Sequence, residues 1–82
     1  MSDVNFEWDE AKDSSNQEKH GISFNEARHA FLDKRRVIAK DIAHSLFEER
    51  YYCFGSDKDG KGILTVRFTI RNGCIRIIGA GY

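Results

Sequence analysis

The chain has 82 residues, and its 13 Lys and Arg balance 13 Asp and Glu. A chain of this length forms one core, so we expect residues 1–82 to be a single domain whose functional site is a shallow surface. The formal charge of zero excludes nucleic-acid binding through the overall charge of the protein. Nucleic-acid binding would need cations gathered at one place on the surface.

The chain carries no sign of a membrane span or a leader. No apolar run approaches the roughly 18 to 20 residues that a span needs, and the acidic first ten residues lack the pattern of a signal peptide. We therefore expect a cytoplasmic protein. Cys53 and Cys74 lie in apolar segments, and we expect two buried or half-buried thiols rather than a disulfide framework.

The N-terminal half predicts two helices. Asp9 is suited to begin a polar helix of about ten residues, and Gly21 to end it. Residues 23–26, Ser-Phe-Asn-Glu, match a capping box that opens a second helix. Apolar residues follow at helical spacing in that helix, namely Phe24, Ala27, Ala30 and Phe31.

The C-terminal half predicts strands. Residues 37–39, 50–54 and 62–70 are rich in β-branched and aromatic side chains, and Asn72-Gly73 is typical of a two-residue hairpin turn. Residues 41–49 receive no assignment. We predict an α+β fold in which two N-terminal helices pack on one face of a small antiparallel sheet.

The hairpin turn predicts which residues share a face. It pairs Arg71 with Cys74 and Arg67 with Ile78, and side chains then alternate between the core and solvent. The expected core residues are Val66, Phe68, Ile70, Ile75 and Ile77, and the expected solvent-facing residues are Arg67, Thr69, Arg71 and Arg76.

The predicted solvent face gathers three guanidinium groups. These repel one another unless an anion or acidic side chains compensate them, and arginine binds phosphate oxygens well. The solvent face of any soluble sheet also carries Arg and Thr, so the pattern leaves both a phosphate site and an ordinary surface open.

Titratable residues elsewhere have two interpretations as well. The titratable residues that could act with this face are Lys19, His20, His44, Glu48, Glu49, Tyr51 and Tyr52, and the candidates for acid-base work are Lys19, His20, His44 and Glu49. However, His20 also suits the end of a helix, His44-Ser45 suits a turn, and Glu48-Glu49-Arg50 suits a solvated surface. The His and Cys residues show no metal-binding spacing, so we expect neither a metal nor a cofactor.

Several motifs along the chain carry a family resemblance. They are Phe6-Glu7-Trp8-Asp9, Asn16, Lys19-His20-Gly21-Ile22-Ser23-Phe24, Glu26-Ala27, Asp41, His44-Ser45, Glu49-Arg50, Gly55, Thr69-x-Arg71 and Ile75-Arg76-Ile77-Ile78. In this order they resemble the BrnT toxin family over nearly the whole chain. The resemblance implies a RelE-like fold, toxicity by ribonuclease activity, and neutralisation by a cognate antitoxin that carries a ribbon-helix-helix DNA-binding domain.

With RNA as the implied substrate, the candidate residues acquire roles. RNA cleavage without a metal needs a base, an acid and cations around the phosphorus. The predicted catalytic residues are Lys19, His20, His44, Glu49, Arg67 and Arg76, with acid and base unassigned. The predicted RNA and phosphate ligands are Arg50, Arg67, Thr69, Arg71 and Arg76.

Two other functions compete with this one. A non-catalytic module would use the same cationic face to bind an acidic antitoxin segment. A DNA-binding regulator is disfavoured, because the sequence has no recognition helix rich in Arg or Lys. The chain has Gly79-Ala80-Gly81-Tyr82 where many relatives continue into a basic C-terminal helix, so we expect that last element to be missing.

Overall fold

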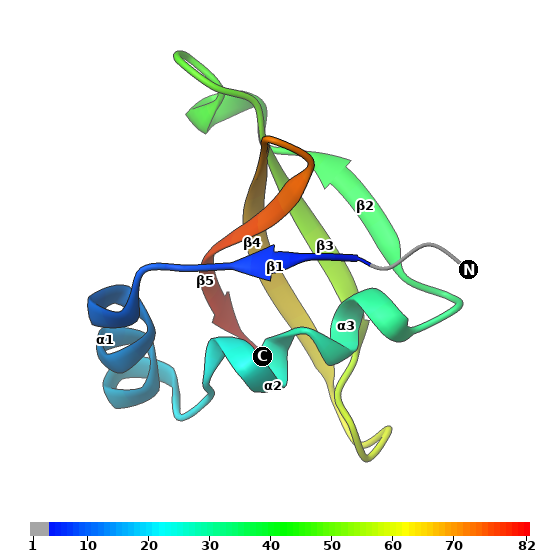
Figure 1. The fold of residues 1–82 in the computed structure, drawn as a ribbon. Coiled ribbons are helices and arrows are strands. Elements are labelled where there is room, and N and C mark those ends of the chain that lie inside the picture. Colours follow the sequence, from blue (N-terminus) through cyan, green and yellow to red (C-terminus); the bar gives the residue numbers. More distant parts are fainter. Residues whose placement is uncertain (1–3) are drawn as a thin grey trace.

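The computed structural model describes residues 4–82, which form a five-stranded sheet and three short α-helices (Figure 1). The elements in chain order are β1 (Phe6–Glu7), α1 (Glu10–His20), α2 (Phe24–Ala27), α3 (His29–Leu32), β2 (Val37–Lys40), the 3-10 helix η1 (Ile42–His44), β3 (Arg50–Ser56), β4 (Ile63–Arg71) and β5 (Cys74–Gly81). The α+β prediction is confirmed.

The sheet has the strand order β1-β5-β4-β3-β2. Four strands are antiparallel as predicted, but β1 pairs with β5 in parallel, so the prediction of a purely antiparallel sheet is wrong. The parallel pairing brings the Phe6 ring within 5.3 Å of the Phe31 ring, centroid to centroid. Strand β1 is too short to be recognised from an alternating pattern of apolar and polar residues in the sequence. In the structure its pairing is accompanied by this apolar contact with α3.

Helix α1 begins and ends where the sequence predicts. The Asp9 side chain accepts hydrogen bonds from the backbone N–H groups of Ala11 and Lys12, at 2.8 and 3.2 Å. Gly21 has φ +70°, a left-handed conformation that favours glycine, and its N–H donates to the Gln17 carbonyl.

The predicted second helix is two short helices, α2 and α3, separated at Arg28. The capping box forms as predicted, with the side chains of Ser23 and Glu26 each bonding to the backbone of the other. Phe24, Ala27 and Ala30 are fully buried. They pack with the buried residues of the strands, which include Cys53, Leu64, Val66, Phe68 and Ile77.

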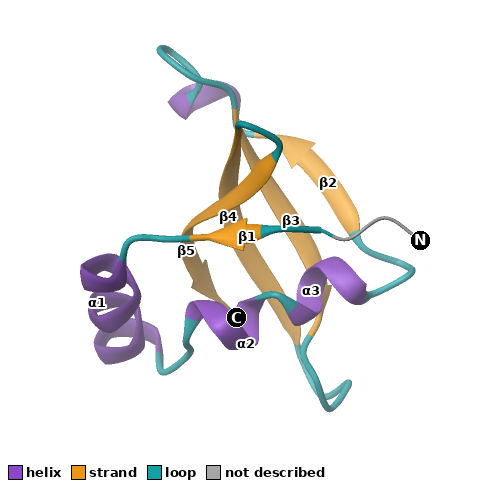
Figure 2. Ribbon diagram, in the orientation of Figure 1, coloured by secondary structure: helices purple, strands orange, loops and turns teal. Residues whose placement is uncertain are grey.

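The helices occupy two different positions around the sheet. Helices α2 and α3 lie across one face, whereas α1 lies beside β5 at the edge (Figure 2). The prediction that both helical segments cover a face is therefore wrong for α1. The physical reason is that α1 lacks an apolar stripe, since Asn16 is its one buried residue.

Asn16 attaches α1 to the sheet by hydrogen bonds. Its side-chain oxygen accepts from the Ala80 N–H at 3.1 Å, and its side-chain nitrogen donates to the Ile22 carbonyl at 2.9 Å. The amide thereby satisfies a backbone N–H of β5 beyond the point where β1 ends.

The β4–β5 hairpin follows the predicted register near its turn. Asn72 and Gly73 both have positive φ, and Arg71 pairs with Cys74 as expected. A bulge next to Arg67 shifts its partner from the predicted Ile78 to Gly79.

Two predicted burial assignments in the hairpin are wrong. Ile70 is 58% exposed, because it lies at the end of β4, close to the Asn72-Gly73 turn. Thr69 is 2% exposed and donates its hydroxyl to the Glu49 carbonyl at 2.7 Å, because the segment that precedes β3 covers this end of the sheet.

The two cysteines are free thiols, as predicted. Cys53 is fully buried and Cys74 is partly buried. Burial raises the pKa of the Cys53 thiol to about 11, so this group is a small apolar side chain at neutral pH.

Gly55 is required by close backbone contact. A Cβ at this position would lie 2.2 Å from the Ala30 carbonyl oxygen in α3. We expect Gly55→Ala to lower the free energy of unfolding by about 3 kcal/mol, because backbone has to move to make room. Urea denaturation measures the loss. The control Gly81→Ala meets only the His20 ring at 3.8 Å and should change stability by less than about 0.5 kcal/mol.

The Asn16 attachment gives a second stability prediction. We expect Asn16→Ala to lower the free energy of unfolding by about 1 to 3 kcal/mol, because the Ala80 N–H loses its partner inside the protein. Ser14→Ala, on the exposed side of the same helix, is the matched control. Equal urea midpoints for the two variants would show that the amide does not hold α1.

Candidate functional site

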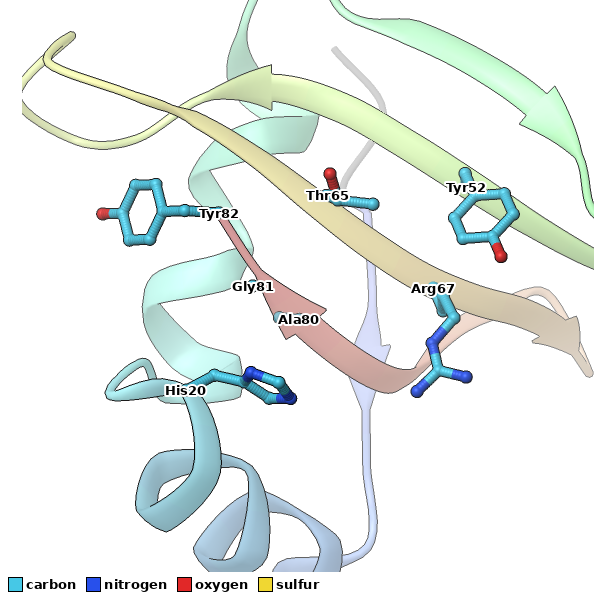
Figure 3. A pocket seen from close by; sticks show the side chains of 7 residues that line it. All are labelled: His20, Tyr52, Thr65, Arg67, Ala80, Gly81 and Tyr82. Carbon is cyan, nitrogen blue, oxygen red and sulfur yellow. The ribbon is translucent and has the colours of Figure 1, made fainter.

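Two adjoining hollows lie where α1 meets the sheet face opposite α2 and α3. We call this face, which carries Arg50, Tyr52, Thr65, Arg67 and Arg76, the open face. The hollows have volumes of about 360 and 180 Å³ and share His20 and Arg67 (Figure 3). The larger is lined by His20, Tyr52, Thr65, Arg67, Ala80, Gly81 and Tyr82, and the smaller by Lys12, Ser15, Asn16, Lys19, His20, Arg67 and Ile78.

Helix α1 supplies three of the basic side chains. Lys12 and Lys19 are seven residues apart, which is about two turns, so they lie on the same side of the helix. His20 occupies the last turn, and its ring lies close to Gly81 of β5. The hydrogen bonds of Asn16 keep this side of the helix against the open face.

Arg67 supplies the guanidinium from the sheet. A Cβ on Gly79 would lie only 2.6 Å from Arg67 Nη2, which shows that the guanidinium lies directly over this glycine. Arg67 forms no ion pair with any residue in the described range 4–82. Figure 3 shows His20 on one side of Ala80 and Gly81 and Arg67 on the other.

The charge of these hollows is strongly one-sided. No Asp or Glu is among the residues that line them, within the part of the chain that the structure describes. Tyr82 at one end donates its hydroxyl to Asp57 at 3.0 Å, and this hydrogen bond raises the pKa of the phenol. The basic side chains that line the hollows are exposed to solvent on the same surface, and they are Lys12, Lys19, His20 and Arg67. This arrangement attracts an anion.

The structure disperses the other arginines of the predicted cationic face. Arg71 binds the Glu48 carboxylate at 2.9 Å, and Arg76 binds Glu7 at 3.1 Å. Arg67 and Arg76 do share the open face, as predicted, but acidic side chains compensate Arg71 and Arg76. Thr69 uses its hydroxyl internally, and so it does not present this group to a ligand.

Glu49 belongs to a separate surface cluster. Its carboxylate accepts hydrogen bonds from the Lys40 ammonium and the Tyr51 hydroxyl, each at 2.8 Å. The bond from Lys40 is the main cause that lowers the pKa of Glu49, and the same bond raises the pKa of Lys40. Glu49 thus lies apart from Lys19, His20 and Arg67.

His44 and Arg50 line another pocket, at the point where β3 begins. The His44 ring binds the buried Asp41 carboxylate at 2.9 Å, and Arg50 lies beside it with a buried Nε. Of the six predicted catalytic residues, Lys19, His20 and Arg67 therefore lie together, whereas His44, Glu49 and Arg76 do not join them.

Sequence reasoning missed Lys12 as a member of the site. The spacing of Lys12 and Lys19 along one helix face was a usable signal. Tyr52 pairs directly with Arg67 across β3 and β4, and the sequence contained no sign of this partnership.

Within residues 4–82, no three His, Cys, Asp or Glu side chains gather as metal ligands would. No helix in the same range combines the length and apolarity that a membrane crossing requires.

The Arg67–Gly79 contact can be tested by anion binding. A methyl group at residue 79 would displace the guanidinium at little cost to stability, because the end of the arginine side chain can move. We expect Gly79→Ala to weaken tripolyphosphate binding about fivefold, which corresponds to about 1 kcal/mol. Amide NMR shifts during titration measure the affinity. An unchanged affinity at matched ionic strength would show that the position of Arg67 does not matter for anions.

Residues 8–82 match the family model of BrnT, the ribonuclease toxin of type II toxin-antitoxin systems. No curated protein matches the chain.

Proposed function

The chain belongs to the BrnT family of type II toxin-antitoxin ribonuclease toxins, and we propose that it is a metal-independent endoribonuclease whose active site is the cationic hollow of Lys19, His20 and Arg67. One observation supports this assignment. These three side chains lie together over β5, and no carboxylate is among the residues lining the two hollows. RNA presents one negative charge per nucleotide, which suits this surface.

The proposed reaction uses the RNA 2′-hydroxyl as the nucleophile. A base removes the 2′-hydroxyl proton, the new bond forms between the 2′-oxygen and phosphorus, and the bond to the 5′-oxygen breaks as an acid protonates that oxygen. The products are a 2′,3′-cyclic phosphate and a 5′-hydroxyl. Every atom comes from RNA, so the reaction needs no external oxidant, reductant or co-substrate.

The side chains divide the work by their chemistry. Arg67 stabilises the negative charge that grows on the phosphate oxygens, because a guanidinium stays protonated and donates several hydrogen bonds. His20 and Lys19 exchange protons with the nucleophile and the leaving oxygen. Lys12, which lines the smaller hollow, binds a neighbouring phosphate.

The family also implies an antitoxin that controls the activity. We propose that the antitoxin neutralises the enzyme by covering the same cationic hollow with acidic side chains, since occlusion is sufficient to exclude RNA. A ribbon-helix-helix domain on the antitoxin, action in the cytoplasm and a RelE-like classification of the fold belong to the same proposal. These features follow from the family resemblance in the sequence.

RNA cleavage by purified variants tests the active site. We expect Arg67→Ala to reduce the rate by about 10² to 10³, the usual cost of losing a donor that stabilises developing negative charge. His20→Ala should reduce it by about 10² to 10⁴. The matched control Arg35→Ala removes an exposed cation from the turn before β2 and should retain the parent rate.

Three outcomes have different meanings. Slow cleavage by folded Arg67→Ala and His20→Ala, with a normal rate for Arg35→Ala and EDTA without effect on the parent, supports the proposal. Parent-like rates for both site variants refute this active site. Absence of RNA cleavage by the parent, together with tight antitoxin binding, would identify a non-catalytic binding module instead.

A further inference from the structure

A pocket of about 280 Å³ lies beneath the loop that joins β2 to β3, away from the proposed active site. It is lined by Ala43, His44, Leu46, Phe47, Glu48 and Arg50. The loop extends beyond one end of the sheet, shown in green at the top of Figure 1. None of its lining residues takes part in the proposed catalytic steps.

Arg50 has an incomplete set of partners. Its Nε atom is buried and has no hydrogen-bond partner among residues 4–82, and its guanidinium forms no ion pair within that range. A buried donor on a charged group is costly to leave unpaired. The nearby Glu48 carboxylate is already bound to Arg71, so Arg50 faces the pocket without a compensating acid.

His44 is held beside Arg50 in a defined orientation. Its Nδ1 atom lies 2.9 Å from the carboxylate of Asp41, which is 6% exposed. This contact fixes the orientation of the imidazole ring. Ser45 fixes the loop, since its hydroxyl donates to the Asp41 carbonyl and accepts from the Arg50 N–H.

The rim of the pocket is apolar and unusually exposed. Leu46 is 83% exposed and Phe47 is 96% exposed. An exposed aromatic ring next to a cation is the combination that proteins use to bind unpaired nucleotides, with the base on the ring and the phosphate on the cation.

We propose that this pocket binds a nucleotide of single-stranded RNA, with its phosphate on Arg50 and its base against Phe47. The inference rests on the proposed function, because it takes RNA as the substrate, but it assigns a separate binding site outside the proposed catalytic residues.

The position of Arg50 in the sheet connects the two sites. Tyr51 packs against Phe68 on the core side, so its neighbours Arg50 and Tyr52 both lie on the open face. Two residues along a strand span about 7 Å, and Tyr52 pairs with Arg67. A single RNA strand on the open face therefore passes from the catalytic hollow to Arg50 without leaving the sheet.

The salt dependence of RNA binding tests the phosphate contact. The probe is a fluorescent 2′-O-methyl hexauridylate, which the proposed reaction cannot cleave because it lacks free 2′-hydroxyl groups. We expect Arg50→Met to weaken binding about fivefold and to reduce the slope of log affinity against log salt by about 0.7, the value for one phosphate contact on a single strand. Arg50→Lys should restore the slope, and the control Arg35→Met should retain both parent values.

Phe47→Ala tests the base contact with a variant that leaves the core intact, because the ring is almost fully exposed. We expect it to weaken hexauridylate binding fivefold or more and to leave inorganic pyrophosphate binding unchanged. Equal loss of both ligands would overturn the base contact. Unchanged binding of both would do the same.

The two proposals fail differently. If Arg67→Ala reduces the salt slope and Arg50→Met matches Arg35→Met, the second site is wrong and the proposed function stands. If pyrophosphate binds at Arg50 but Arg50→Met leaves hexauridylate binding unchanged, the pocket takes a free anion and the proposed RNA site is overturned. Failure of the parent to bind hexauridylate would contradict both proposals.

Discussion

The hydrogen bonds of the Asn16 amide hold α1 beside β5, and the candidate active site depends on this attachment. The helix has almost no apolar surface to bury, so apolar packing alone would not fix it at the sheet edge. By accepting from Ala80 and donating to Ile22, the amide substitutes for a neighbouring strand where β1 has already ended. Lys19 and His20 thereby face Arg67, which comes from another part of the chain.

The distribution of acidic partners separates the structural arginines from the available ones. Glu48 and Glu7 compensate Arg71 and Arg76, whereas Arg67 and Arg50 have no acidic partner in residues 4–82. A chain with no net charge therefore carries two local surfaces suited to phosphate. This distinction rests on contacts between residues distant in the chain, such as the 69 positions that separate Glu7 from Arg76.

Local chemistry explains how much of the fold was predictable. The Asp9 and Gly21 caps, the Ser23–Glu26 capping box and the Asn72-Gly73 turn each depend on residues within one turn of chain, and all formed as expected. The bulge beside Arg67 and the burial of Thr69 were not predictable in this way. The first shifts a pairing between strands, and the second depends on how the segment before β3 folds over the sheet.

The sequence by itself determined the α+β class, both ends of α1, the position of the hairpin turn, the family resemblance and the residue types able to hold phosphate. Short-range hydrogen bonds and backbone preferences decide these features, and they act between residues close together in the chain. Only the tertiary structure decided that Lys19, His20 and Arg67 meet, that Arg71 and Arg76 are compensated, and that Arg50 is not. Charges act through space, so the state of each arginine depends on which acidic side chain the fold brings within reach.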